Sequence, residues 1–193
     1  MSQNRRTILL AGARLAAGGL AVGLAAGLPV RRAQAASARQ LGADATAALH
    51  RLYATQPKAR QLGAKARAIL VFPKIIKGGL IIGGQSGDGA LLVGLKPIEY
   101  YNISAASFGL QAGGQTFSYA LFFMNDKALE YLRKSDGWAI GSGPSVVVMD
   151  KGAAASITST TLSEDVYAIP FGQKGLMAGL GLEGSKITQI HPS

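Results

Sequence analysis

The stretch from Ala66 to Asp126 constrains the fold most, because apolar residues alternate through much of it with polar or small residues. This period of two is typical of β-strands that cover a core with one face. Glycines occur within the apolar runs as well as between them, which predicts strands that bend or pack closely. Two turns are expected here. One is a hairpin turn at Ser86–Gly89, and the other is a proline-fixed turn at Phe72–Lys77 that ends the first strand and presents two lysines.

The rest of the chain predicts an α+β fold in which helices flank a mostly antiparallel, barrel- or sandwich-like sheet. Apolar residues recur at helical spacing over 37–54, and Pro57 ends that helix or begins a second one over 58–67. A short helix is predicted over 126–134, where Asp126 suits the N-cap. Short strands with tight turns continue to residue 190, which favours an antiparallel barrel or sandwich.

Residues 1–35 have the pattern of a signal peptide, with a charged start, an apolar middle and an A-x-A site before Ala36. Arg5-Arg6 resemble a twin-arginine export signal, and a second pair, Arg31-Arg32, favours that route over ordinary secretion. An uncleaved membrane anchor is the alternative, but glycines and Pro29 interrupt an apolar run that is short for a bilayer span. We therefore expect export to the periplasm or cell envelope, with cleavage after Ala35.

The mature chain is expected to be one domain, in which a helical region at 36–67 packs with a glycine-rich β domain at 68–193. The full sequence has a formal net charge of +10, but residues 1–35 contain five arginines and no acidic residue. The mature part is therefore near +5. Its excess is uneven, because Ala45 to Gly87 contains seven Lys or Arg and no Asp or Glu. Such a run predicts an anionic partner, namely lipid headgroups, nucleic acid or an acidic polymer, unless it is only a solvated face.

The second predicted helix places cations on both sides of a narrow apolar stripe. Lys58 and Lys65 flank one side of the stripe, and Arg60 and Arg67 flank the other. The stripe, which consists of Ala59, Leu62 and Ala66, suits either a helix at a membrane surface or a helix packed on the sheet. One leucine and two alanines give little insertion energy, so we favour packing, with the cations facing outward.

No residue set in the sequence predicts catalysis. The chain has no cysteine, and its two histidines, His50 and His191, lie near opposite ends of the mature chain. The G-x-G-x-x-G match at 179–184 is followed by too few residues for a nucleotide-binding helix and its acidic partner. No metal-ligand spacing is visible. We expect a non-enzymatic protein with no metal and no cofactor.

Several segments occur in the order found in a known family, namely Ala68–Lys74, Gly78-Gly79, Gly83–Gln85, Tyr100–Ile103, Ser107–Gly113, Phe122–Met124, Gly137-Trp138 and Lys174–Gly179. Together they span about Ala66 to Ile190 and resemble the SYLF lipid-binding domain family, here an exported bacterial member. The resemblance implies binding of acidic phospholipids. Its eukaryotic members use a basic amphipathic N-terminal segment for this, and the corresponding region is Ser37–Arg67.

The charge pattern and the resemblance together predict an exported, non-catalytic protein that recognises anionic phospholipid headgroups through a basic patch. We expect a membrane surface as partner and no transmembrane span in the mature chain. A cell-envelope structural or assembly protein acting through protein–protein contacts is the alternative. Nucleic acid is disfavoured, because strand aromatics are not interleaved with cations. An actin-related role is not inferred, because the chain contains no SH3 domain. The predicted lipid-binding residues are Lys58, Arg60, Lys65, Arg67, Lys74 and Lys77.

Overall fold

The computed structural model describes residues 37–79, 82–108, 113–149, 163–175, 182 and 184–193. The predicted signal peptide and most of the glycine motif at 179–184 lie outside these residues. Among the helices that are described, none is long and apolar enough to cross a membrane. All the described residues belong to one compact unit.

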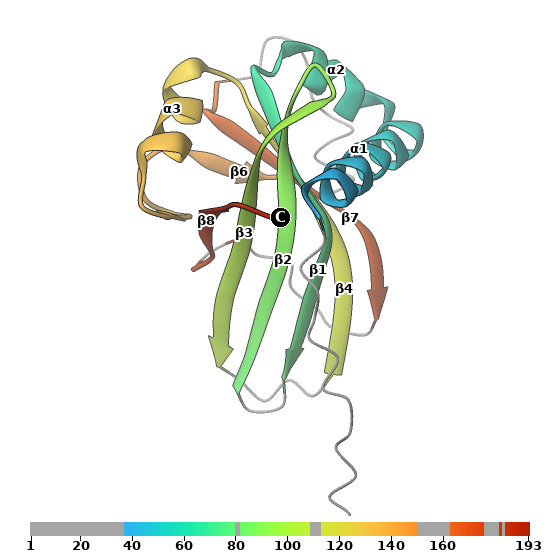
Figure 1. The fold of residues 1–193 in the computed structure, drawn as a ribbon, viewed down its shortest axis with the longest axis vertical. Coiled ribbons are helices and arrows are strands. Elements are labelled where there is room, and N and C mark those ends of the chain that lie inside the picture. The colour runs from blue at the N-terminus through green and yellow to red at the C-terminus, as the bar shows by residue number, and fades with distance from the viewer. Residues whose placement is uncertain (1–36, 80–81, 109–112, 150–162, 176–181, 183) are drawn as a thin grey trace, which may run out of the picture. The chain divides into compact units, whose positions relative to one another are not determined.

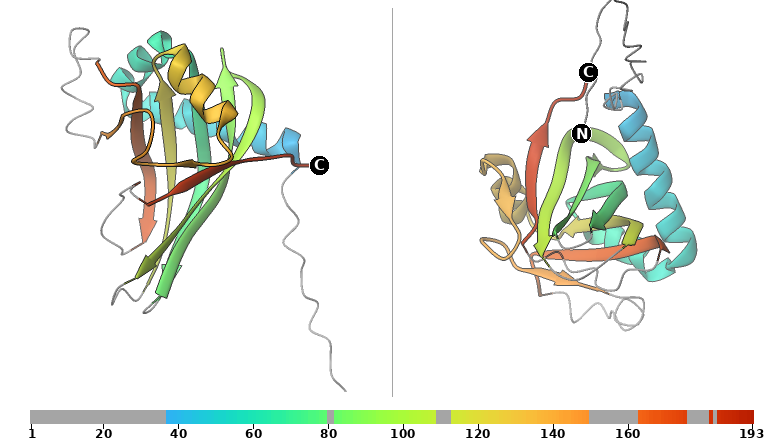
Figure 2. Two further views of the ribbon diagram at one scale, coloured as in Figure 1. Left: turned by 90° about the vertical axis from the view of Figure 1, so that its left-hand side faces the viewer. Right: turned by 90° about the horizontal axis from the view of Figure 1, so that it is seen from below.

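Within the described residues, eight strands form one sheet in the order β5-β8-β3-β2-β1-β4-β7-β6, which curls into a half-barrel (Figure 1, Figure 2). Neighbouring strands are antiparallel except β6 and β7, which are parallel. This architecture confirms the predicted α+β class with a mostly antiparallel sheet. The strands are β1 (Ala68–Gly79), β2 (Ile82–Val93), β3 (Lys96–Phe108), β4 (Gly113–Phe123), β5 (Trp138–Ala139), β6 (Val146–Val148), β7 (Val166–Gly175) and β8 (Lys186–Ile190).

The three helices of the described residues begin and end within two residues of the predicted limits. Ser37 caps the first helix with its side-chain oxygen, and Pro57 occupies the first turn of the second, where its missing N–H breaks no helical hydrogen bond. The N-cap of the third helix is Asn125 and not Asp126, which instead supplies a negative charge in the first turn. The helices are α1 (Ala38–Thr55), α2 (Pro57–Lys65) and α3 (Asp126–Lys134).

The two faces of the sheet bury separate sets of side chains, because residues alternate along each strand. In β1, Ile69 and Val71 pack beneath α1 and α2. Leu70 and Phe72 pack on the opposite face with residues of α3. Helices α1 and α2 therefore cover one face, which we call the α1 face, and α3 covers the other (Figure 2).

The predicted turn at Phe72–Lys77 is wrong, because β1 continues through this segment as a β-bulge and ends at Gly79. The register between β1 and β4 shifts between Phe72 and Ile75. A bulge suits Pro73, which has no N–H for the strand ladder. The Ser118 hydroxyl donates a hydrogen bond to the Pro73 carbonyl (2.7 Å), which satisfies an acceptor at the irregular position. The proline therefore bends the strand without ending it.

The predicted hairpin turn at Ser86–Gly89 is also wrong, since these residues lie within β2 and pair with β3. A Cβ atom on Gly87 would lie 2.5 Å from the Lys74 carbonyl oxygen, and one on Gly89 would lie 2.5 Å from the Val71 carbonyl oxygen. Real Cβ atoms do not approach a backbone oxygen so closely. The two glycines thus let β2 coil tightly over the bulged part of β1, and they form no turn.

Candidate functional site

The apolar stripe of α2 is buried inside the protein. Ala59 and Leu62 are almost fully covered and pack in the same cluster as Leu52 and Ile69. The prediction that the stripe packs on the fold is therefore confirmed, and these side chains are not available for insertion into a membrane. Burial of this stripe turns the opposite side of the helix outward, where Arg60 and Lys65 are exposed.

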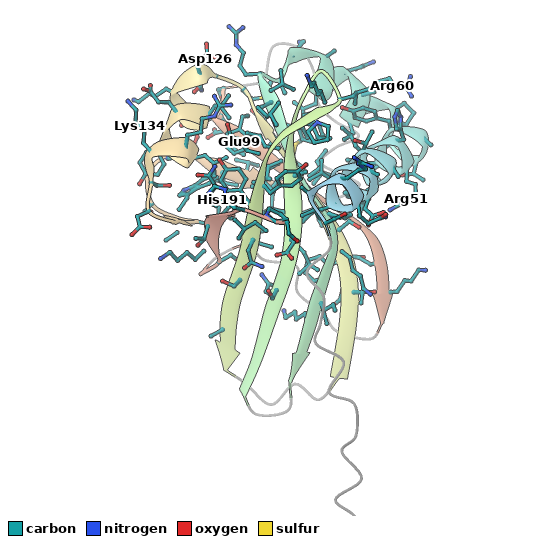
Figure 3. The ribbon with its side chains drawn as sticks, in the orientation of Figure 1. Arg51, Arg60, Glu99, Asp126, Lys134 and His191 are labelled. Atoms are coloured by element: carbon teal, nitrogen blue, oxygen red, sulfur yellow. The ribbon has the colours of Figure 1, made fainter. Side chains whose placement is uncertain are left out.

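A groove of about 320 Å³ lies between α2, the C-terminal part of α1, the start of β1 and the end of β2. We call it the α2 groove. Two of the predicted lipid-binding residues, Arg60 and Arg67, line it together with apolar groups that include Leu92 and Leu95. Arg60, which is labelled in Figure 3, belongs to α2. The groove therefore combines two guanidinium groups with an apolar wall, as an amphiphilic anion requires.

The charges of the groove are only weakly neutralised by other parts of the protein. The Arg60 guanidinium lies 5.6 Å from the centre of the Tyr53 ring. Burial raises the pKa of Tyr53, and the nearby Arg60 charge partly opposes this, so the phenol stays neutral at physiological pH. Arg67 approaches the Asp126 carboxylate at 3.7 Å, but both side chains are largely exposed. Such a surface ion pair contributes little and leaves the arginine open to a stronger anion.

Exposed apolar side chains flank the turn between β2 and β3, and one of them, Leu95, lines the α2 groove. Val93, Leu95 and Ile98 are 42%, 43% and 41% exposed, and we call these three residues the apolar tip. Leu95 has a φ of 68° and is the only non-glycine residue with a positive φ in the described ranges. This left-handed conformation costs a leucine roughly 1 kcal/mol. An exposed leucine at a position that favours glycine or asparagine marks the tip as a candidate contact surface.

The apolar tip is absent from the sequence predictions. Gly94 also has positive φ (55°), so it and Leu95 form the reversal that joins β2 to β3. The available signal was Gly94 followed by Pro97 within four residues, a pairing that is typical of turns. Leucine between them argued against a turn, because it is a poor residue for positive φ.

The structure does not bring the six predicted residues together into one patch. Lys58 and Lys65 belong to α2 but do not line its groove. Lys74 follows the β-bulge onto the α1 face and lines a different groove. Lys77 lies two residues from Ile75, so it shares the opposite face with it. Arg60 and Arg67 are the two that share a groove.

Besides Tyr53 and the two arginines, the α2 groove is lined by one further titratable side chain, His50. Within the described residues, no group of three or more His, Asp or Glu side chains is placed to hold a metal ion. What the arrangement offers chemically is recognition of negative charge beside an apolar surface.

The second half of the chain has a recognisable relationship to known proteins. Residues 104–191 match the model of the Ysc84 family, described as "Las17-binding protein actin regulator". No curated protein matches the chain. The match runs from β3 to β8, whereas the α2 groove and the apolar tip are formed by residues 50–98. The resemblance to the SYLF (Ysc84) family seen in the sequence is confirmed over residues 104–191, which match the model of that family.

Proposed function

We propose that the protein is an exported, non-catalytic module that binds anionic phospholipid headgroups at a membrane surface through the α2 groove, the lysines of α2 outside that groove, and the apolar tip. The observation that carries the proposal is that one groove joins Arg60 and Arg67 to the exposed Leu95 of the tip. The SYLF assignment supports it, because the resemblance implies binding of acidic phospholipids. The predicted signal peptide supports a location in the periplasm or cell envelope.

The expected affinity follows from charge and apolar contact together. A basic residue near an anionic membrane surface contributes about 1 kcal/mol. Engagement of Lys58, Arg60, Lys65 and Arg67 therefore gives ~4 kcal/mol, which corresponds to only millimolar affinity. Burial of the exposed parts of the apolar tip adds roughly 2–4 kcal/mol. The sum corresponds to a Kd of roughly 1 to 40 micromolar, so the tip strengthens a weak charge contact into a usable membrane attachment.

Cosedimentation with vesicles tests the proposal, using residues 36–193 because all described elements lie in one compact unit. We expect binding to phosphatidylglycerol vesicles and not to phosphatidylcholine vesicles. Replacing Lys58, Arg60, Lys65 and Arg67 by glutamine should abolish sedimentation. A matched control removes four cations that lie elsewhere, namely Arg39, Lys127, Lys134 and Lys186. Equal binding to both lipids, or an equal loss in the control variant, would refute the proposal.

Protein–protein assembly is a second candidate, and a specific feature of the sheet favours it. Strand β6 ends the sheet of the described residues, and its Val147 and Val148 are 38% and 41% exposed. An apolar edge strand is a template for pairing with another chain. Crosslinking of intact cells tests this role. A crosslinked species that disappears in Val147→Lys supports assembly, and its persistence in that variant rejects β6 as the contact.

A further inference from the structure

A second groove lies beside the C-terminal part of α1, between that helix and strands β1, β4 and β7. It has a volume of about 590 Å³, and three cations line it: Arg51, Lys74 and Lys174. We call it the three-cation groove. It shares no lining residue with the α2 groove. Figure 3 shows Arg51, which belongs to α1, away from Arg60 at α2.

The β-bulge is what brings Lys74 to this groove. In a regular strand, Lys74 would share a face with Phe72 and would point into the core beneath α3. The extra residue of the bulge puts Ile75 into that core instead. Lys74 is thereby turned to the α1 face, where it is exposed beside α1. Bulges commonly redirect a side chain in this way near functional sites.

Strand register places Lys174 on the same face. Lys174 on β7 is paired with Thr116 on β4, and Thr116 is paired with Ile76 on β1. Ile76 lies two residues after Lys74 and so faces the same way. The two lysines are therefore two strands apart, about 10 Å across the sheet. Arg51 reaches the same groove from α1, so three separate elements supply its charge.

No carboxylate balances these three charges within the described residues. None of the three cations forms an ion pair there, and no acidic side chain among the described residues lines the groove. Asp44 lies on the same side of α1 as Arg51, but it is seven residues away, about 10 Å along the helix. It also accepts a hydrogen bond from the Gln40 side chain. Three like charges facing one groove repel one another, and a bound anion would relieve that repulsion.

The lining of the groove indicates the class of anion. Arginine presents a planar fork that matches phosphate oxygens, and lysines add compact charges beside it. Two or three cations suit a phosphate dianion better than a carboxylate, which carries one charge. Pro73 and the buried Phe171 give the groove an apolar part, and its volume is that of a small-molecule site. We propose that the three-cation groove binds the phosphate group of an organic phosphate, either a soluble phosphate monoester or a phospholipid headgroup.

Calorimetric titration of residues 36–193 at fixed ionic strength tests this proposal. The probes are glycerol 3-phosphate and monomeric dioctanoyl phosphatidic acid. We expect saturable binding at one site, weakened about tenfold in each of Arg51→Gln, Lys74→Gln and Lys174→Gln. Arg39→Gln removes the same charge from an exposed position elsewhere on α1 and should bind as the unmodified protein does. No saturable binding of either probe, or equal loss in Arg39→Gln, overturns the proposal.

The two probes separate the possible sources of the phosphate. Tighter binding of the phosphatidic acid supports a lipid headgroup, and equal binding supports a soluble monoester.

The outcome of the calorimetric titration can also be told apart from that of the vesicle assay. An Arg60→Gln/Lys65→Gln variant should lose vesicle binding and keep glycerol 3-phosphate binding. If the unmodified protein does not bind vesicles but its titration with either probe saturates, the proposed membrane function is refuted and the proposal for the three-cation groove is supported.

Discussion

Removal of the apolar tip should weaken membrane binding while leaving the fold intact. The variant is Val93→Ser/Leu95→Asn/Ile98→Ser. Asparagine is chosen at position 95 because it accepts the left-handed conformation better than leucine does. Relief of that strain offsets part of the packing that Leu95 loses against the α2 groove. Slightly more than half of each of the three side chains is buried, which is worth about 2.5–5 kcal/mol in all, so we expect the free energy of unfolding to fall by roughly 2–4 kcal/mol.

The loss of affinity follows from the exposed fraction of each side chain. Complete burial of a Val, Leu or Ile side chain contributes about 1.5–3 kcal/mol. The tip residues are 41–43% exposed, so membrane contact has that share of each side chain left to bury. Three such contributions sum to roughly 2–4 kcal/mol, and their loss should raise the Kd for phosphatidylglycerol vesicles about 30- to 900-fold.

A matched variant separates tip insertion from a general loss of surface hydrophobicity. Val147→Ser/Val148→Ser changes two side chains of similar exposure, 38% and 41%, on β6. It should leave vesicle cosedimentation unchanged, with urea denaturation confirming that both variants fold. If the tip variant binds as tightly as the unmodified protein, or if the β6 variant loses as much affinity, then the argument from Leu95 is wrong.

Two further predictions concern the stability of the fold. Gly89→Ala should destabilise the protein by about 1–3 kcal/mol in urea unfolding, because the added methyl meets the Val71 carbonyl; Gly114→Ala, with no atom within 4 Å of its added Cβ, should cost little. Hydrogen bonds from the Asn125 side chain and then from the Ser145 N–H lower the pKa of Asp165. Its stabilisation is therefore complete above the unfolded pKa of about 4 and is lost as pH falls through the lower folded value, so Asp165→Asn should flatten the dependence of stability on pH below about 4.

The helices were predictable because their signals are local. Apolar spacing, a capping Ser37, the early Pro57 and a capping Asn125 all lie within the segments they define. The glycines of β2 carry a different kind of information. Gly87 and Gly89 have the composition of a turn, but their lack of a side chain serves close packing with β1. That contact depends on the partner strand, so the sequence around the glycines does not reveal it.

The candidate site was predicted only in part, for a related reason. The outward cations and buried stripe of α2 follow from helical periodicity, and the structure bears out that packing. The position of Lys74 depends on a bulge that reverses the alternation of β1, and one extra residue is enough to exchange the two faces. Leu95 was missed because a leucine at positive φ opposes local preference. Such conflicts between local preference and observed conformation are expected where function dominates.

The path of the acid-free run from Ala45 to Gly87 explains why two grooves receive positive charge. The run forms the second half of α1, then α2, β1 and the first part of β2, and it supplies lining residues to both grooves. His50 and Arg51 are neighbours in sequence but line different grooves, because successive helical residues point in different directions. The α2 groove adjoins the exposed apolar tip and therefore suits a surface that is both charged and apolar. The three-cation groove gathers charge from three elements and therefore suits a single compact phosphate.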